Sequence, residues 1–204
     1  MKSIVPAPQP ASARAFTLVE LLIVITIITI LTVGAYGGYA ILLERGRITD
    51  ARTTGIALLA GIRNFEHDYD RYPVPGSASK DSDVETDTGA GEGLVAILKG
   101  ADIDQNPRQT DFLGEIKPAR TVTRHGVTKY ENGLIYDGDT SISLYDPWGQ
   151  LYFVTLDLNY DNQVTNPGPG DSSGLNLRQP AIVYSAGKDG DKNTFGDNIC
   201  TWKQ

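Results

Sequence analysis

The sequence predicts an α+β fold, in which a long N-terminal α-helix packs on a small antiparallel β-sheet. Residues 21–43 form an apolar run of 23 residues without a charged side chain. From Ile48 to Tyr72, apolar residues recur at alternating steps of three and four, the spacing of one helix face. Nearer the C-terminus, residues 151–156 and 181–185 are apolar segments of strand length bounded by Gly and Asp turns.

The composition indicates one acidic globular part. The chain has 204 residues and a formal net charge of −7, and without residues 1–15 it carries 16 basic and 25 acidic side chains. Nucleic acid is therefore not expected as a partner, because phosphate contacts need Lys and Arg. The single cysteine, Cys200, excludes an internal disulfide, and we expect it to be a small apolar residue in the fold.

The expected organisation has three parts: a cleaved leader at 1–15, a transmembrane and assembly half of the helix at 16–43, and a globular domain at 44–204 that includes the outer half of the helix. As a helix rising ~1.5 Å per residue, residues 21–43 would span ~34 Å, against ~30 Å for a bilayer core. Basic residues stand on both sides of this run, so charge alone does not orient it.

Beyond the helix, the element boundaries follow from Gly and Pro. Pro73 and Pro75 should end the helix. Residues 76–93 are rich in Ser, Asp and Gly, and we expect a surface loop there. Residues 94–98 predict a short apolar helix closed by Gly100, and residues 114–144 predict short strands whose pairing the sequence does not give.

The start of the apolar run carries a recognisable motif, Arg14-Ala15-Phe16-Thr17-Leu18-Val19-Glu20. It resembles the class III signal of prepilins and pseudopilins. The resemblance implies that prepilin peptidase cuts between Ala15 and Phe16 and that the new amine of Phe16 is then methylated. Ala15 stands where the family usually has Gly; both are small, so we expect slower or equal cutting.

Glu20 is the one acidic residue at the head of this run. A carboxylate within a membrane helix costs roughly 2.5–3.5 kcal/mol at mid-bilayer, so it needs a partner. The resemblance supplies the amine of Phe16 in a neighbouring subunit, a pair that would set the register of a filament. The alternative is that Glu20 simply lies at headgroup depth.

Several later motifs resemble the major pseudopilin of type II secretion. They are Tyr72-Pro73, Asp146-Pro147-Trp148-Gly149, the turn Ser185-Ala186-Gly187-Lys188-Asp189-Gly190, and the terminal Trp202. The resemblance implies a single-pass inner-membrane protein with its globular domain in the periplasm. Such subunits form a homo-oligomeric helical filament that drives protein export, with other pseudopilins and an inner-membrane assembly platform as partners. A surface type IV pilus subunit for adhesion, motility or DNA uptake is the alternative, followed by a membrane-anchored calcium-binding module that does not polymerise.

The acidic C-terminal loop is a candidate calcium site. Asp189, Asp191, Asp197 and Asn198 offer hard oxygen ligands within ten residues, and in the resembled family a structural calcium lies in this loop. The alternative is a solvated turn. The sequence Asp157-x-Asn159-x-Asp161 is similar to the start of an EF-hand loop, but Asn162 stands where Gly is expected and Gly168 where the bidentate Glu should be.

The sequence offers no catalytic residues. Its two histidines, His67 and His125, have no nucleophile or metal-type partner at a recognisable spacing, and no Gly-rich phosphate loop follows a strand. We expect His67 on a solvated helix face and a protein that is not an enzyme.

Overall fold

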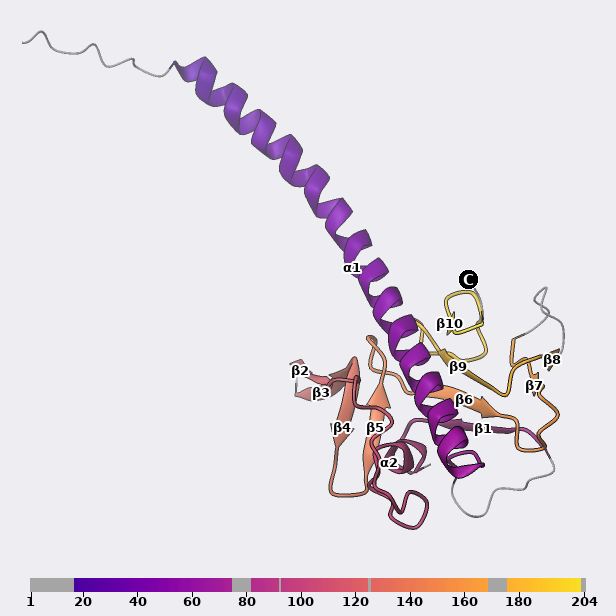
Figure 1. Cartoon of the computed structure of the whole chain (residues 1–204). Helices are drawn as coiled ribbons and strands as arrows, with labels where there is room; N and C mark the ends of the chain where they lie inside the picture. Colours follow the sequence, from indigo (N-terminus) through magenta and orange to yellow (C-terminus); the bar gives the residue numbers. More distant parts are fainter. Residues whose placement is uncertain (1–16, 75–81, 92, 125, 169–175, 203–204) are drawn as a thin grey trace, which may run out of the picture. The chain divides into compact units, whose positions relative to one another are not determined.

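The structure is a computed structural model of the chain (Figure 1), and it describes residues 17–74, 82–91, 93–124, 126–168 and 176–202. The chain divides into two compact units, residues 1–43 and residues 44–204. The expected division into a cleaved leader, a membrane half of the helix and a globular domain stays a prediction.

One helix, α1, runs through both units from Leu18 to Tyr69. We expected a helix over residues 16–72; its type is confirmed, and it ends three residues earlier than expected, at Tyr69. Asp70 adopts a left-handed backbone conformation with φ 53°, so the right-handed helix ends before it. Pro73 then follows, and its ring lacks the N–H that a further turn would need.

The first unit contains the part of α1 that we expected to cross a membrane. Among the residues that the structure describes, no helix combines the length and the hydropathy of a membrane span. The side chains of residues 34–38, in the middle of the expected span at 21–43, lie outside the described set.

Within the described residues, the second unit adds a short helix and ten strands. Their bounds are β1 Val84–Asp87, α2 Leu94–Leu98, β2 Arg120–Arg124, β3 Val127–Glu131, β4 Gly133–Tyr136, β5 Ile142–Tyr145, β6 Tyr152–Leu156, β7 Val164–Thr165, β8 Asn176–Leu177, β9 Ala181–Ser185 and β10 Ile199–Cys200. The expected segments at 94–98 and 181–185 are confirmed with these bounds, and the expected strand at 151–156 begins one residue later.

The strands form one four-stranded antiparallel sheet, in the order β1-β6-β9-β10, and three two-stranded pairs, β2-β3, β4-β5 and β7-β8. In the register of the larger sheet, Val154 faces Thr86 on one side and Val183 on the other. Figure 1 shows the outer half of α1 lying across a face of this sheet. The structure thus confirms the α+β class, a helix packed on a small antiparallel sheet.

The core lies between the outer half of α1, α2 and the sheet. The helix stripe contributes Leu58, Ile62 and Phe65, all fully buried, and the sheet contributes Val154 and Val183. Ile48, the first residue of the predicted stripe, is 37% exposed and lies outside this core. Cys200 is buried, as expected of a small apolar residue.

One prediction about the globular part was wrong. We expected residues 76–93 to be a loop, but residues 84–87 form β1, the edge strand of the main sheet. Three of its four residues are polar, so the segment shows no apolar alternation; its strand character comes from backbone pairing with β6. The expected short strands of 114–144 are β2 to β5, and the structure supplies the pairing that the sequence did not.

Candidate functional site

The N-terminal candidate residues are only partly described. Ala15 and Phe16, the expected cleavage and methylation residues, lie outside the described residues. Glu20 lies in the first turn of α1 and belongs to a capping box with Thr17. The backbone N–H and the hydroxyl of Thr17 donate to Glu20 Oε2 at 2.8 and 2.9 Å, and the N–H of Glu20 donates to Thr17 Oγ1 at 3.2 Å.

This capping box gives Glu20 a local role that we did not predict. The signature was present in the sequence, because Thr-x-x-Glu before an apolar run is the pattern of a helix N-terminus. The two donations from Thr17 hold the carboxylate over the first turn of α1. Helix capping and a charge pair with another subunit are compatible, since a carboxylate has acceptor sites for several donors.

The helix residues that follow Glu20 expose apolar side chains in every direction. Leu21, Ile30 and Leu42 are 60%, 66% and 67% exposed. An apolar surface of this extent marks an interaction site rather than a solvated helix. Its hydroxyls are satisfied locally, because Thr26, Thr29 and Thr32 each donate to the carbonyl four residues earlier.

The Asp-Pro-Trp-Gly motif forms a turn around a buried carboxylate. Asp146 is fully buried, and its Oδ1 accepts the backbone N–H groups of Trp148 and Gln150 at 2.9 and 2.8 Å. Its Oδ2 accepts the hydroxyl of Ser185 at 2.6 Å. Burial raises the pKa of Asp146, and the bonds from Ser185, Gln150 and Trp148 act against that rise.

The same serine connects this turn to the C-terminal loop. Ser185 ends β9, and its Oγ accepts the N–H of Gly187 at 3.0 Å. Gly187 has φ +70°, and a Cβ there would lie 2.4 Å from the carbonyl oxygen of Asp197. Glycine is therefore required where the two ends of the loop meet, and Asp146 fixes the position of its first end.

The candidate calcium residues lie in this loop. Asp197 Oδ2 accepts the N–H groups of Lys188 and Asp189 at 3.0 and 3.1 Å. Asp189 accepts the N–H of Asp191 and the hydroxyl of Thr194, and these bonds lower its pKa. The loop is therefore folded by bonds from its own backbone and hydroxyl groups to its carboxylates.

The placement of these groups does not by itself form a metal site. Among the described residues, no group of three or more His, Cys, Asp or Glu side chains could hold a metal ion. One observation favours a cation: Asn198 is 9% exposed, and its buried Oδ1 has no hydrogen-bond partner within the described chain. Its Nδ2 donates to the carbonyl of Lys192 at 3.0 Å, which keeps the side chain within the loop.

The second acidic turn uses its carboxylates differently from an EF-hand. Asp157 is 1% exposed, and its two oxygens accept the N–H groups of Asp161 and Asn162 at 3.2 and 2.6 Å. Tyr160 and Asn162 both have φ 60°, a conformation that the tight turn imposes. These bonds make Asp157 the centre of an Asx-type turn.

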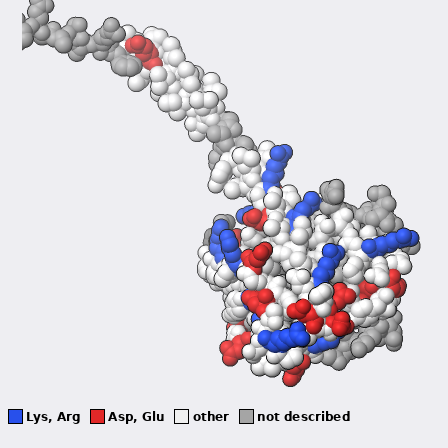
Figure 2. Space-filling model, viewed as in Figure 1, with Lys and Arg blue, Asp and Glu red and all other residues white. Residues whose placement is uncertain are grey.

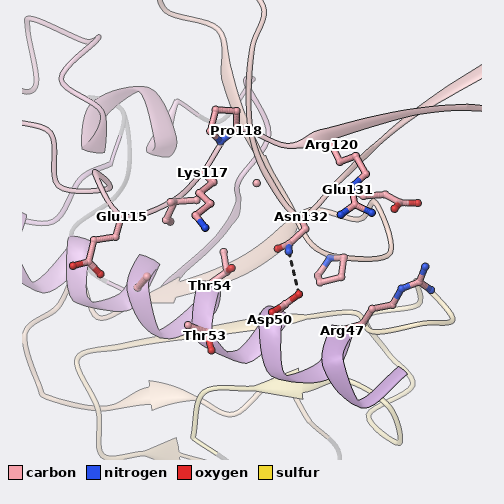
Figure 3. Close-up of a pocket in the computed structure, with 14 residues that line it drawn as sticks. Arg47, Asp50, Thr53, Thr54, Glu115, Lys117, Pro118, Arg120, Glu131 and Asn132 are labelled. Atoms are coloured by element: carbon pink, nitrogen blue, oxygen red, sulfur yellow. Dashed lines mark hydrogen bonds between the residues drawn. The ribbon is translucent and has the colours of Figure 1, made fainter. Parts of the chain in front are cut away.

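A cleft of about 510 Å³ lies beside the outer half of α1 (Figure 3). One wall is a face of α1 with Arg47, Asp50 and Thr54, and the other is the segment around Lys117 and Asn132. Figure 3 shows Asp50 and Asn132 meeting across the cleft, where the amide donates at 3.3 Å. Sequence reasoning missed this cleft because its walls come from distant segments, with Asp50 and Asn132 separated by 82 residues.

The structure describes one of the two histidines. His67 is exposed on α1, as expected, and lies 3.5 Å from the carboxylate of its neighbour Asp68. His125 lies outside the described residues.

Comparison with known proteins gives one match. Residues 10–36 match the family model of the prokaryotic N-terminal methylation motif. No curated protein and no solved structure gives a significant match to the chain. The match includes Ala15, Phe16 and Glu20, and it supports a type IV pilin-like chain whose N-terminus is processed by prepilin peptidase and anchored in a membrane.

Proposed function

We propose that this protein is a structural subunit of a type II secretion pseudopilus, which polymerises at the inner membrane to drive protein export. The observation that carries the proposal is the methylation motif at residues 10–36, with Glu20 at the head of an apolar helix. The exposed apolar side chains that follow Glu20 add support, because a filament core or a bilayer would cover them.

Assembly would depend on two charges at the start of α1. Hydrolysis of the peptide bond between Ala15 and Phe16 creates a new amine on Phe16, and methylation keeps that amine basic. Glu20 of one subunit would pair with the Phe16 amine of its neighbour. In apolar surroundings this pairing would offset the cost of burying both charges, so it would set the axial register of the filament.

The pseudopilus is preferred to a surface pilus because of the C-terminal part. The Asp-Pro-Trp-Gly turn and the Ser-x-Gly-x-Asp-Gly turn resemble those of the major pseudopilin, and Ser185 joins them through bonds to Asp146 and Gly187. Deleting the gene would distinguish the two functions: we expect loss of exoprotein secretion with motility, adhesion and DNA uptake unchanged. The opposite result would assign the chain to a surface pilus.

Calcium at the C-terminal loop is a further part of the proposal. Support comes from the donor chemistry of Asp189, Asp191, Asp197 and Asn198, and from the unpartnered Oδ1 of Asn198. A divalent cation would bind the oxygen atoms of these side chains, and its binding would stabilise the folded loop.

The experiment that tests the main proposal is mass spectrometry of the mature N-terminus. In a host with prepilin peptidase, we expect the membrane fraction to contain a chain that begins at Phe16 and carries one N-methyl group. An intact Met1 in that fraction, with an active peptidase, would overturn the proposal.

Variants of the capping box then separate the two roles of Glu20. Glu20→Gln keeps an acceptor for Thr17 and removes the charge, whereas Thr17→Val removes the hydroxyl cap and keeps the charge. If the charge pair sets the register, Glu20→Gln should abolish filaments and Thr17→Val should retain them. Filaments from Glu20→Gln at the wild-type yield would contradict the role of the charge.

A further inference from the structure

The hairpin formed by β2 and β3 differs in charge from the rest of its unit. Residues 120–131 carry three basic side chains and one acidic one, whereas the remainder of residues 44–204 carries 13 basic and 23 acidic ones. Figure 2 shows acidic and basic side chains intermixed over the visible face of the second unit. A short segment with an excess of positive charge is therefore a local exception on an acidic body.

The structure leaves the positive charge of this hairpin available. Arg120 and Lys129 are exposed, and neither takes part in an ion pair among the described residues. β2 and β3 pair with each other and with no further strand in the described chain. The hairpin can therefore accept a partner without breaking contacts of its own.

The register gives the hairpin one face of defined chemistry. Arg120 lies opposite Glu131, and Val122 lies opposite Lys129. Because every second residue of a strand points to the same side, Arg120, Val122, Val127 and Lys129 share a face, and Glu131 lies on it beside Arg120. Val127 is 59% exposed, and Val122 is half-buried. A face with two cations, one carboxylate and an exposed valine fits an acidic protein surface that also offers apolar contact.

The cleft beside the hairpin does not have the hairpin's excess of positive charge. It is lined by equal numbers of basic and acidic side chains: Arg47, Lys117 and the hairpin's own Arg120, with Asp50, Glu115 and Glu131. We therefore assign the docking role to the hairpin face rather than to the cleft.

The same unit carries an acidic counterpart at the turn between β4 and β5. Asp137 and Asp139 are exposed in this turn, and residues 132–146 contain no basic side chain. Neither aspartate takes part in an ion pair within the described chain. The turn therefore offers two free carboxylates to a basic partner.

The basic and acidic surfaces lie at opposite ends of one ladder. β4 begins at Gly133, directly after β3, and ends at Tyr136, directly before the acidic turn. Figure 1 shows β2 and β3 near one end of β4 and the β4–β5 connection at the other. Complementary surfaces at opposite ends join copies head to tail, and repetition of a contact that does not close gives an open helical filament.

We propose that the β2–β3 hairpin of one copy docks on the acidic β4–β5 turn of the next copy. The inference rests on the proposed function, because it concerns subunits that assemble through their N-terminal helices. A second copy is favoured over nucleic acid because the chain itself carries the acidic complement and has a net charge of −7, which would repel phosphate.

Charge exchange in the full-length chain, processed in its host, tests the contact. Arg120→Glu with Lys129→Glu should reduce filament yield by about tenfold or more, because repulsion replaces attraction. Asp137→Lys with Asp139→Lys should do the same, and the four changes together should restore the yield. Arg63→Glu with Arg178→Glu is the matched control: it changes the net charge equally at exposed positions elsewhere and should leave the yield within about twofold.

Cross-linking with the native charges in place provides a readout that does not depend on those variants. Val127→Cys with Thr140→Cys should give a ladder of covalent multimers with a short bismaleimide, while either variant alone should give none. Cross-linking by Val127→Cys alone would indicate a symmetric hairpin-to-hairpin contact and would overturn the proposal.

The remaining outcomes are also decisive. Wild-type filaments that persist at full yield in both double reversals would overturn this inference while leaving the proposed function intact. Failure of the processed wild-type chain to form any filament would overturn the proposed function and this contact with it. Duplex DNA binding that depends on Arg120 and Lys129, with unchanged filament yield, would assign the hairpin to nucleic acid instead.

Discussion

Residues 18–43 and residues 44–69 belong to the same helix, yet their apolar side chains have opposite surroundings. In the first half, Leu18 and Leu42 are 81% and 67% exposed. In the second half, Leu58 and Ile62 are fully buried against α2 and the sheet. Because burial of such a side chain is worth ~1.5–3 kcal/mol, the chain stabilises the outer half by itself. The first half depends on contacts that other molecules would supply.

Shortening a buried side chain of α1 should have the largest effect on stability, and the effect should differ between the two halves of the helix. Phe65 is fully buried, with its ring 5.5 Å from that of Phe112. Phe65→Ala should lower the free energy of unfolding by about 3–5 kcal/mol, because it leaves a cavity. Ile25→Ala, at a residue 54% exposed, should change it by less than ~0.5 kcal/mol. Urea unfolding of the detergent-solubilised chain measures both, and an equal loss in the two variants would contradict the contrast.

Removal of the buried carboxylate of Asp146 should have the next largest effect on stability. Asp146→Ala should lower the free energy of unfolding by roughly 2–3 kcal/mol, because Trp148, Gln150 and Ser185 lose their acceptor. Asp146→Asn keeps an acceptor oxygen and should be much less costly. A loss as large in the Asn variant would show that the charge itself is required.

The same residue predicts a dependence on pH. Burial raises the folded-state pKa of Asp146 above its ordinary value of 3.8, so between the two values the folded chain binds more protons than the unfolded chain. This group's contribution to stability therefore decreases as the pH rises from 3.8 through the folded-state pKa. Urea unfolding of Asp146→Asn over that range should lack this decrease, and an unchanged slope would contradict the assignment.

Calcium should stabilise the second unit by a similar or smaller amount. At a hundredfold excess over Kd, a bound ion contributes ~2.7 kcal/mol, which corresponds to several degrees in Tm. A fragment of residues 44–204 should therefore melt higher in millimolar calcium than in chelator. Asp189→Ala should abolish the difference and Asp157→Ala should not. Identical melting with and without calcium would mean that the loop's own hydrogen bonds are sufficient, and loss of the effect in Asp157→Ala would move the site to the other turn.

Removal of the capping box should have the smallest effect on stability, and the effect should be confined to the first half of α1. Thr17→Val should destabilise the first turn by about 1 kcal/mol, because the N–H of Glu20 loses its acceptor. Hydrogen exchange in micelles should show faster exchange of the first-turn amides and no change beyond residue 44. Faster exchange throughout the outer half would show that the two halves of α1 are coupled.

The sequence predicted those elements whose chemistry is local. The helix stripe, the short helix at 94–98 and the strand at 181–185 each carry their own periodicity or apolar run, and the structure confirms them. β1 was missed because Glu85, Thr86 and Asp87 are polar, and only the backbone of β6 makes the segment a strand.

The candidate sites differ in the same way, because some are local in the sequence and others join distant segments. The processing motif and the Thr17–Glu20 capping box are contiguous and could be identified from the sequence. The Asp146–Ser185 bond and the cleft between Asp50 and Asn132 join segments 39 and 82 residues apart. No spacing rule connects such pairs, since their proximity results from the packing of the whole unit.

The position of β9 in the main sheet has a consequence for synthesis. β9 lies between β6 and β10, and Val183 contacts the helix beside Gly55. The ribosome therefore makes the helix first and β9, which packs beside it, more than 100 residues later. Until β9 emerges, Tyr152 and Val154 on β6 lack the strand that pairs with them on that side. The unit thus completes its core only after β9 has been made, so a nascent chain that stalls before residue 181 exposes an apolar helix face and invites aggregation or proteolysis.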